Sequence, residues 1–282
     1  MKFYYENTKG EIIDFSDFPY LFQEGDLIDS SWKYDEQNGK IINKNRGIGE
    51  RSFKIAVVPD YTVHLSERHE QLKAAMDRIY EVFDYDAANH LYGKLYSDTG
   101  YYLPCQIVAS AKDSWNCALP YCFQTFSIIS EKNMWIKESS IVYTTGGGNA
   151  VNLNGALDYP YDYEYDYGFV LDKLSFENNS FIESDFIMKI QGEVNSPSVY
   201  INRHLYCVDV ILEAGDILEI NSREHKITLT RLNGKVENCF DLRNRDSYVF
   251  KKISAGTNTL ASAQKLSIML TYFDERGEPR WS

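Results

Sequence analysis

The chain has 282 residues, of which 44% are hydrophobic and 25% charged, so it can build one large β domain or two ordinary domains and is not globally disordered. Its formal net charge of -12, without a long basic stripe, argues against nucleic-acid binding, because such a surface repels phosphates. No apolar run is long enough to span a membrane, and the polar start MKFYYENTKGEIIDF lacks the apolar core of a signal peptide. We therefore expect a soluble chain made in the cytoplasm.

The first 64 residues are predicted to form short strands and turns. FYYENTKGEIIDF contains two β-rich runs around Asn-Thr-Lys-Gly, which predicts a hairpin. SFKIAVV (52–58) is predicted to be a strand that ends at Pro59-Asp60.

The segment 66–83 has the period of an amphipathic helix. Its apolar residues recur at spacings of four, three and four, and Ser66 is a suitable N-cap. The expected buried face consists of Leu72, Met76, Ile79 and Phe83. Strands are expected to resume after this helix at 90–96, 101–110, 122–130 and 140–145.

Composition changes between residues 144 and 168, where Gly146, Gly147 and Gly148 mark a loop or linker. We place a domain boundary here. The sequence predicts a mainly β protein of two domains, an N-terminal β domain with one amphipathic helix and a C-terminal antiparallel β-sandwich. The predicted bounds are 1–145 for the first domain, 146–168 for a glycine-rich hinge and a strap of tyrosines and acids, and 169–282 for the second domain.

The second domain is predicted to consist almost entirely of strands. Eight short β-rich runs at regular spacing are typical of a sandwich. Asn233-Gly234 is the strongest hairpin signal, because both turn positions of such a hairpin need positive φ. The expected strands lie within 169–176, 184–194, 198–212, 216–220, 225–232, 235–242, 247–253 and 265–273.

The tract DYPYDYEYDYG (158–168) matches the pattern of a calcium loop only in part. A loop that starts at Asp162 has acids at positions 1, 3 and 5, but Tyr167 replaces the glycine of position 6 and Lys173 the glutamate of position 12. An extended strap fits better, with tyrosines packed on protein and carboxylates in water. A looser cation site and stacking of the tyrosines on sugar remain alternatives.

No residue pattern predicts a catalytic, cofactor-binding or metal-binding site. His64 and His69 lack the spacing of a zinc helix, His204 and Cys207 would face opposite sides of a strand, and Cys117 and Cys122 have no second pair. The five cysteines are an odd number and indicate reduced thiols. G-x-S-x-G and Walker motifs are absent, although a glycosidase pair among the many carboxylates stays an open alternative.

The order of elements resembles that of the siphophage distal tail proteins (Dit). In the N-terminal half the resemblance rests on the strand SFKIAVV, the helix LKAAMDRIYEVF and the segments YYLPCQIVASAKDSW and FQTFSIISEKNMW. In the C-terminal half it rests on GEVNSPSVYIN (192–202), LEAGDILEINSREHKITL (212–229), NGKVENCFDL (233–242), ISAGTNTL (253–260) and IMLTYFDERGEPRW (268–281).

The resemblance implies a ring-forming N-terminal domain, a galectin-like C-terminal sandwich and no enzymatic activity. It also implies a homo-oligomer, a hexameric ring in the virion tail that links the tail tube to tail-tip or receptor-binding proteins after synthesis in the bacterial host cytoplasm. FYYENTKGEIIDF is a candidate ring contact, unless it is an ordinary hairpin packed on its own domain. The alternative function is a carbohydrate-binding module or adhesin for host cell-surface glycans.

Overall fold

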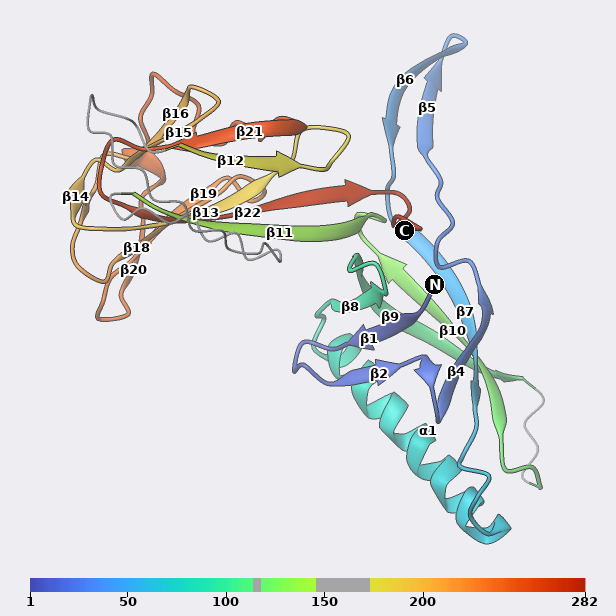
Figure 1. Ribbon diagram of the computed structural model, residues 1–282. Coiled ribbons are helices and arrows are strands. Elements are labelled where there is room, and N and C mark those ends of the chain that lie inside the picture. Colours follow the sequence, from blue (N-terminus) through green and yellow to red (C-terminus); the bar gives the residue numbers. More distant parts are fainter. Residues whose placement is uncertain (114–117, 146–172, 282) are drawn as a thin grey trace, which may run out of the picture. The chain divides into compact units, whose positions relative to one another are not determined.

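The computed structural model describes residues 1–113, 118–145 and 173–281 (Figure 1). The strap predicted at 158–168, its glycine hinge and Cys117 lie outside these residues. The chain divides into two compact units, unit 1 with Met1–Lys137 and Glu275–Ser282, and unit 2 with Glu138–Asp274. The prediction of a mainly β protein with one α-helix is confirmed for the described residues.

Unit 1 is an antiparallel sheet packed on the helix α1. The sheet order is β9-β10-β7-β4-β3, and β8 joins β9 to β1, which also pairs with β2. The elements are β1 (Phe3–Glu6), β2 (Ile12–Asp14), β3 (Ser16–Asp17), β4 (Tyr20–Gly25), β5 (Lys33–Gln37), β6 (Lys40–Asn45), β7 (Gly49–Val57), α1 (Leu65–Ala88), β8 (Gly93–Ser97), β9 (Tyr102–Asp113) and β10 (Cys122–Ser130).

Helix α1 buries the apolar face that its sequence period predicts. Leu72, Met76, Ile79 and Phe83 all lie in the core of unit 1. The N-cap prediction was wrong by two residues, because His64 is the cap and its ring Nδ1 accepts from the backbone N–H of Ser66. Serine is a preferred N-cap residue because its side-chain oxygen accepts a hydrogen bond from a backbone N–H of the first helical turn. An imidazole nitrogen can accept the same bond.

The N-terminal hairpin prediction is confirmed by the pairing of β1 with β2, which aligns Glu6 with Ile12. Its turn is fastened to the last turn of α1 through Asp86, a fully buried carboxylate. The Tyr5 hydroxyl donates to Asp86 Oδ2 at 2.7 Å, and the Thr8 hydroxyl and backbone N–H donate to Oδ1 at 2.6 and 3.1 Å. Tyr5 and Phe3 are buried, so this hairpin packs on its own unit.

Strands β5 and β6 form a hairpin that was not among the predicted elements. They pair only with each other among the described residues and extend away from β4 and β7 (Figure 1). Gln37 is opposite Lys40, so Asn38 and Gly39 make a two-residue turn in which both have positive φ, 53° and 72°. We call residues 33–45 the β5–β6 ribbon.

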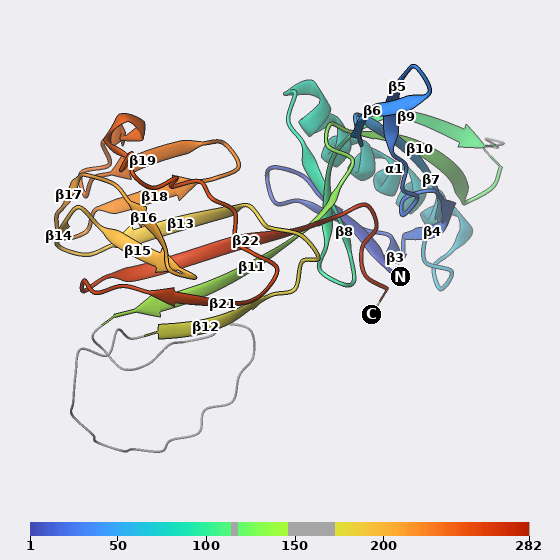
Figure 2. The ribbon, with the colours of Figure 1, turned by 90° about the horizontal axis from the view of Figure 1, so that it is seen from above.

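Unit 2 is a two-layered antiparallel sandwich (Figure 1). One sheet has the order β20-β19-β18-β13-β22-β11, whose central strands lie side by side in Figure 2, and the other has the order β12-β21-β15-β16. Its strands are β11 (Trp135–Thr144), β12 (Lys173–Asn178), β13 (Phe186–Gln191), β14 (Val194–Asn195), β15 (Ser198–Ile201), β16 (His204–Cys207), β17 (Ile211–Leu212), β18 (Ile217–Asn221), β19 (Lys226–Thr230), β20 (Val236–Asn238), β21 (Gly256–Ala261) and β22 (Ser267–Arg276), with a 3-10 helix η1 (Phe240–Leu242).

Three strand predictions in unit 2 need correction. The run 247–253 is not a strand; its apolar character comes from Val249 and Phe250, which a turn buries in the core. The run 198–212 is divided by a tight turn at Asn202 and Arg203, whose φ values are 48° and 69°. Only part of 235–242 is a strand, since η1 follows β20, and β21 was missed.

The Asn233-Gly234 hairpin is present, but its turn differs from the prediction. Of the two residues only Gly234 has positive φ, 82°. The backbone N–H of Gly234 donates to Arg231 O, and Arg231 N–H donates to Lys235 O, both at 2.9 Å. This is a type I turn followed by a glycine bulge, the three-residue alternative to the two-residue turn.

Candidate interaction surfaces

The histidines and cysteines considered in the sequence are dispersed in the structure. Across the described ranges, no group of three or more His, Cys, Asp or Glu side chains is placed to hold a metal ion. His64 caps α1, and His69 Nδ1 lies 3.0 Å from Leu65 O. His204 and Cys207 are engaged separately, with His204 Nε2 2.9 Å from Tyr248 O and Cys207 Sγ 4.0 Å from Ser196 O.

The four described cysteines are buried, free thiols. Burial raises the pKa of Cys105 to about 12 and also raises the pKa of Cys122, Cys207 and Cys239. The thiolate is the reactive form of cysteine, so these side chains behave as small core residues at neutral pH.

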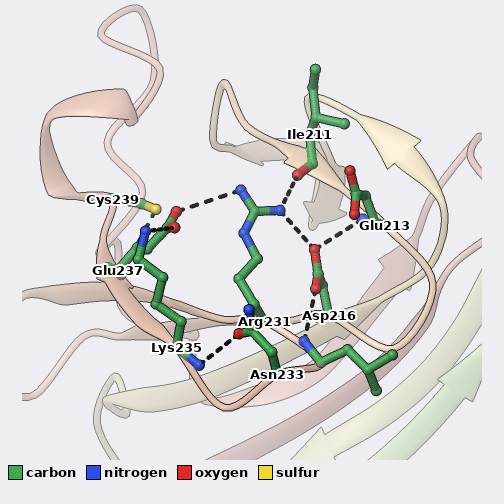
Figure 3. Close-up of polar contacts among 9 residues, drawn as sticks. Ile211, Glu213, Asp216, Arg231, Asn233, Lys235, Glu237 and Cys239 are labelled. Atoms are coloured by element: carbon green, nitrogen blue, oxygen red, sulfur yellow. Dashed lines mark hydrogen bonds and ion pairs between the residues drawn. The ribbon is translucent and has the colours of Figure 1, made fainter.

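A polar network fixes one edge of the unit 2 sandwich (Figure 3). The Arg231 guanidinium lies between two carboxylates, 2.7 Å from Asp216 Oδ2 and 3.4 Å from Glu237 Oε2, and it also donates to Ile211 O. Asp216 is buried and accepts the backbone N–H groups of Glu213 and Leu232. The guanidinium is thus held by protein oxygens and serves to fasten the β19–β20 turn to the loop before β18.

The same network lowers the pKa of both carboxyl groups. For Asp216 the main cause is the hydrogen bond from Glu213 N–H, with Arg231 adding to it; for Glu237 the main cause is Lys235. Both groups are therefore ionised at neutral pH. Around them, Ile211, Leu232 and Val236 expose apolar side chains, so this edge offers an apolar surface with a charged rim.

The sheet of unit 1 has strand edges that are paired only in part. Residues 106–113 of β9 pair with β10 on one side and with no other strand among the described residues. At the opposite edge, β3 pairs with only Tyr20 and Leu21 of β4. Unpaired backbone N–H and C=O groups at an edge are able to pair with another chain.

The β5–β6 ribbon is the most exposed element of unit 1. Every residue of both strands is exposed. Large apolar side chains are concentrated there and at its base: Trp32, Tyr34, Ile41, Ile42 and Ile48. Aromatic side chains such as those of Trp32 and Tyr34 are enriched in the buried centres of protein interfaces.

A second exposed apolar patch of unit 1 joins the β3–β4 turn to the start of α1. The rings of Phe18 and Tyr61 meet edge to face with centroids 6.1 Å apart, and Leu65 is exposed nearby in sequence. Asp17 and Asp60 precede the two aromatic residues in the sequence and add a carboxylate beside each. Hydrogen bonds from Thr62 lower the pKa of Asp60. We call Phe18, Tyr61, Leu65, Asp17 and Asp60 the acidic aromatic patch.

None of the described helices is both long and apolar enough to cross a lipid bilayer. No family model and no curated protein matches the sequence.

Solved structures do resemble this chain. The Dit protein of phage SPP1, a hub adsorption apparatus of phages that infect Gram-positive bacteria, is similar over 96% of this chain and 98% of that chain, with a TM-score of 0.59 and 10% identity. Chains of the phage P2 baseplate in its activated conformation, with Ca and with Sr, are similar over 96% of this chain and 97% of theirs, with TM-scores of 0.52 and 0.51 and 13% identity. The fold that the sequence resemblance implied is confirmed: this chain has the mainly β fold of the SPP1 Dit protein.

Proposed function

We propose that this chain is a structural protein of a phage or prophage tail, a distal hub that connects the tail tube to the tip or baseplate. The observation that carries the proposal is the likeness to the SPP1 Dit protein, which spans nearly the whole of both chains. Because the likeness covers 96% of this chain, it includes both units rather than one common β domain.

The exposed surfaces support a role in assembly. A hub has to bind copies of itself and other tail proteins, and this chain presents partly open strand edges, the β5–β6 ribbon and the acidic aromatic patch. Such surfaces act by binding, so the role requires no catalytic group. Partners would be the tail tube on one side and tail-tip or receptor-binding proteins on the other.

The hub would work as a closed ring of six copies in the virion tail, after synthesis in the bacterial host. Heterologous contacts close into a ring when a whole number of the rotations that relate neighbouring copies adds up to one full turn. Native mass spectrometry and negative-stain imaging of the purified chain test this: we expect an assembly of six copies with a central opening. Another closed copy number would contradict the hexamer, and binding of host wall polysaccharide by a chain that stays monomeric would favour the glycan-binding alternative.

A further inference from the structure

The turn of the β5–β6 ribbon places an asparagine directly before a glycine at an exposed tip. In an Asn-Gly dipeptide the backbone nitrogen of the glycine is able to attack the side-chain carbon Cγ of the asparagine, and glycine has no Cβ to obstruct the attack. Asparagine is for this reason among the thermolabile residues. Asn38 and Gly39 are both exposed and form the whole of the turn.

The reacting groups of this turn are not held in place. Neither the Asn38 side chain nor the Gly39 N–H has a hydrogen-bond partner among the described residues. A Cβ built on Gly39 would meet no atom within 4 Å, so the space around the turn is open. The side chain is thus free to rotate toward the backbone nitrogen that follows it.

The strands on either side of the turn also open easily. Every residue of β5 and β6 is exposed, and these strands pair only with each other in the part of the chain that the structure describes. A two-stranded hairpin alone in water is only marginally stable. Local opening of the ribbon therefore lies at the low end of the free energies that a folded protein spans.

A second Asn-Gly turn has nearly the same local sequence and a different structure. Asn38 lies in Gln-Asn-Gly-Lys and Asn233 lies in Leu-Asn-Gly-Lys, so the attacking residue and the residue after it are the same. In the second turn the backbone N–H of Lys235 donates to Asn233 Oδ1 at 2.9 Å. The N–H of Gly234, on the attacking nitrogen, donates to Arg231 O at 2.9 Å. Both reacting groups are engaged.

The second turn is also fastened to the sandwich of unit 2. It joins β19 to β20 in the main sheet, and the Arg231 guanidinium at its base contacts the carboxylates of Asp216 and Glu237. Opening this turn breaks that network, whereas opening the ribbon breaks no contact with the core. The structure therefore predicts unequal reactivity for two dipeptides that the sequence makes nearly equal.

We propose that Asn38 is a site of spontaneous covalent modification, at which the chain converts its own asparagine to aspartate and isoaspartate. The Gly39 backbone nitrogen loses its proton to solvent base and bonds to Asn38 Cγ. The Cγ–Nδ2 bond breaks, and the amide nitrogen takes up protons from water and leaves as ammonia. Water then opens the cyclic imide at Cγ, which gives aspartate, or at the backbone carbonyl, which gives isoaspartate. No step is an oxidation or a reduction.

The modification changes both the charge and the pairing of the ribbon. Residues 33–45 carry three lysines and two carboxylates, so a new carboxylate at position 38 cancels the excess positive charge. Isoaspartate also inserts a methylene group into the backbone of a two-residue turn, whose φ values of 53° and 72° close the hairpin in its present register. The ribbon of an aged chain thus differs chemically from that of a new one.

Peptide mapping of the full-length chain during incubation in warm neutral buffer tests the site. Cleavage after lysine places Asn38 in the peptide 34–40 and Asn233 in the peptide 227–235, and mass spectrometry with chromatography separates the asparagine, aspartate and isoaspartate forms. Asn154-Gly155, outside the described residues, falls in a third peptide, 138–173.

In the folded chain we expect Asn38 to be lost at least about tenfold faster than Asn233, because the second turn reacts only after it opens. The rate at Asn38 should rise in proportion to the hydroxide concentration, since the attacking nitrogen must lose its proton. Both aspartate and isoaspartate should accumulate in the peptide 34–40.

Two controls separate the structure from the local sequence. In concentrated urea both turns are open, so Asn38 and Asn233 should react at similar rates. Asn38→Gln in the folded chain should abolish the reaction at position 38 and leave Asn233 unchanged, because glutamine closes the larger ring far more slowly. Circular dichroism and thermal unfolding check that this variant is folded.

Three results overturn the proposal. They are a folded chain that loses Asn38 no faster than Asn233, a difference between the two sites that persists unchanged in urea, and a peptide 34–40 that stays unmodified in the folded chain. The second result would show that the neighbouring residues, and not the turns, set the rates. The proposed hub role does not depend on any of them, since it is tested by the position of the chain on the virion.

Discussion

Asp216 and Arg231 show how individual residues stabilise the edge of the unit 2 sandwich. The Asp216 carboxylate is buried and still ionised, because two backbone N–H groups and the Arg231 guanidinium all donate to it. Removing one partner of such a pair costs more than the pair contributes, since the remaining charge is left buried without a partner. The arrangement also makes the stability of this edge dependent on pH.

The sign of that dependence follows from the lowered pKa of Asp216. A carboxylate with a lower pKa in the folded state stabilises the fold above its unfolded pKa of about 3.9, and this contribution is lost as the pH falls through the folded pKa. We expect Asp216→Asn to lower the midpoint of thermal unfolding at pH 7, with a difference from wild type that shrinks below about pH 4. Asp241→Asn, whose side chain is 97% exposed, is the control and should change little. A difference that is constant from neutral to acidic pH would contradict this account.

Gly93 permits the buried contact between Tyr5 and Asp86 in unit 1. A Cβ at this position would overlap Tyr5 Oη and Asp86 Oδ2, which form a 2.7 Å hydrogen bond. We expect Gly93→Ala to lower the free energy of unfolding by about 1–3 kcal/mol, the usual cost of overpacking a core.

A double-mutant cycle tests the cause of that loss. Tyr5→Leu removes both the hydroxyl and the ring carbon Cζ that the new methyl group would overlap, so the double variant should be destabilised by less than the sum of the two single variants. Urea unfolding measures all three. Strictly additive losses would show that Gly93 is required for another reason.

At the scale of elements, the Asn-Gly turns at residues 38–39 and 233–234 show that one dipeptide can form different hairpins. Asn38 and Gly39 both have positive φ and close a two-residue turn, whereas at Asn233-Gly234 only the glycine does. The pairing of the flanking strands decides between the two turns. The first turn belongs to the isolated β5–β6 ribbon and the second to the main sheet of unit 2.

This difference predicts unequal effects of the same substitution. Gly39 and Gly234 have φ of +72° and +82°, and an added Cβ would contact nothing within 4 Å at either, so alanine costs roughly 1 kcal/mol of backbone strain at both. Gly39→Ala should speed amide exchange in the ribbon and leave the thermal midpoint unchanged, because the ribbon contributes nothing to the core. Gly234→Ala should lower the midpoint of unit 2. Equal losses would mean that the ribbon folds as part of the core.

Sequence predicted the elements whose signal is local. The face of α1 follows from its period, and β10 was predicted at its observed bounds, 122–130, from a β-rich run. The turn at Asn202 and Arg203 has no glycine to mark it, and the 247–253 run looks like a strand because Val249 and Phe250 are buried by a turn. The candidate surfaces depend on which strands pair, and long-range contacts decide that pairing. The sequence therefore points only to the N-terminal hairpin as a contact, and the residues Phe3 and Tyr5 of this hairpin are buried in its own unit.

At the scale of the whole molecule, the fold is retained with little sequence in common. The likeness to the SPP1 Dit protein extends over nearly the full length at 10% identity. A fold with local turn signals and alternating strands specifies its core by pattern, and many sequences satisfy one pattern. The surfaces carry the specific function of each protein, which is why the ribbon and the open edges are central to the proposed hub.

The position of the chain on the assembled particle tests the hub role most directly. Gold-labelled antibody against the purified chain is applied to phage particles released from cells that carry its gene, and bound gold is located by electron microscopy. We expect gold only at the end of the tail that is distal to the head, because a hub joins the tube to the tip. Gold along the whole tail, gold at the head, or particles that carry none of the protein would contradict the account.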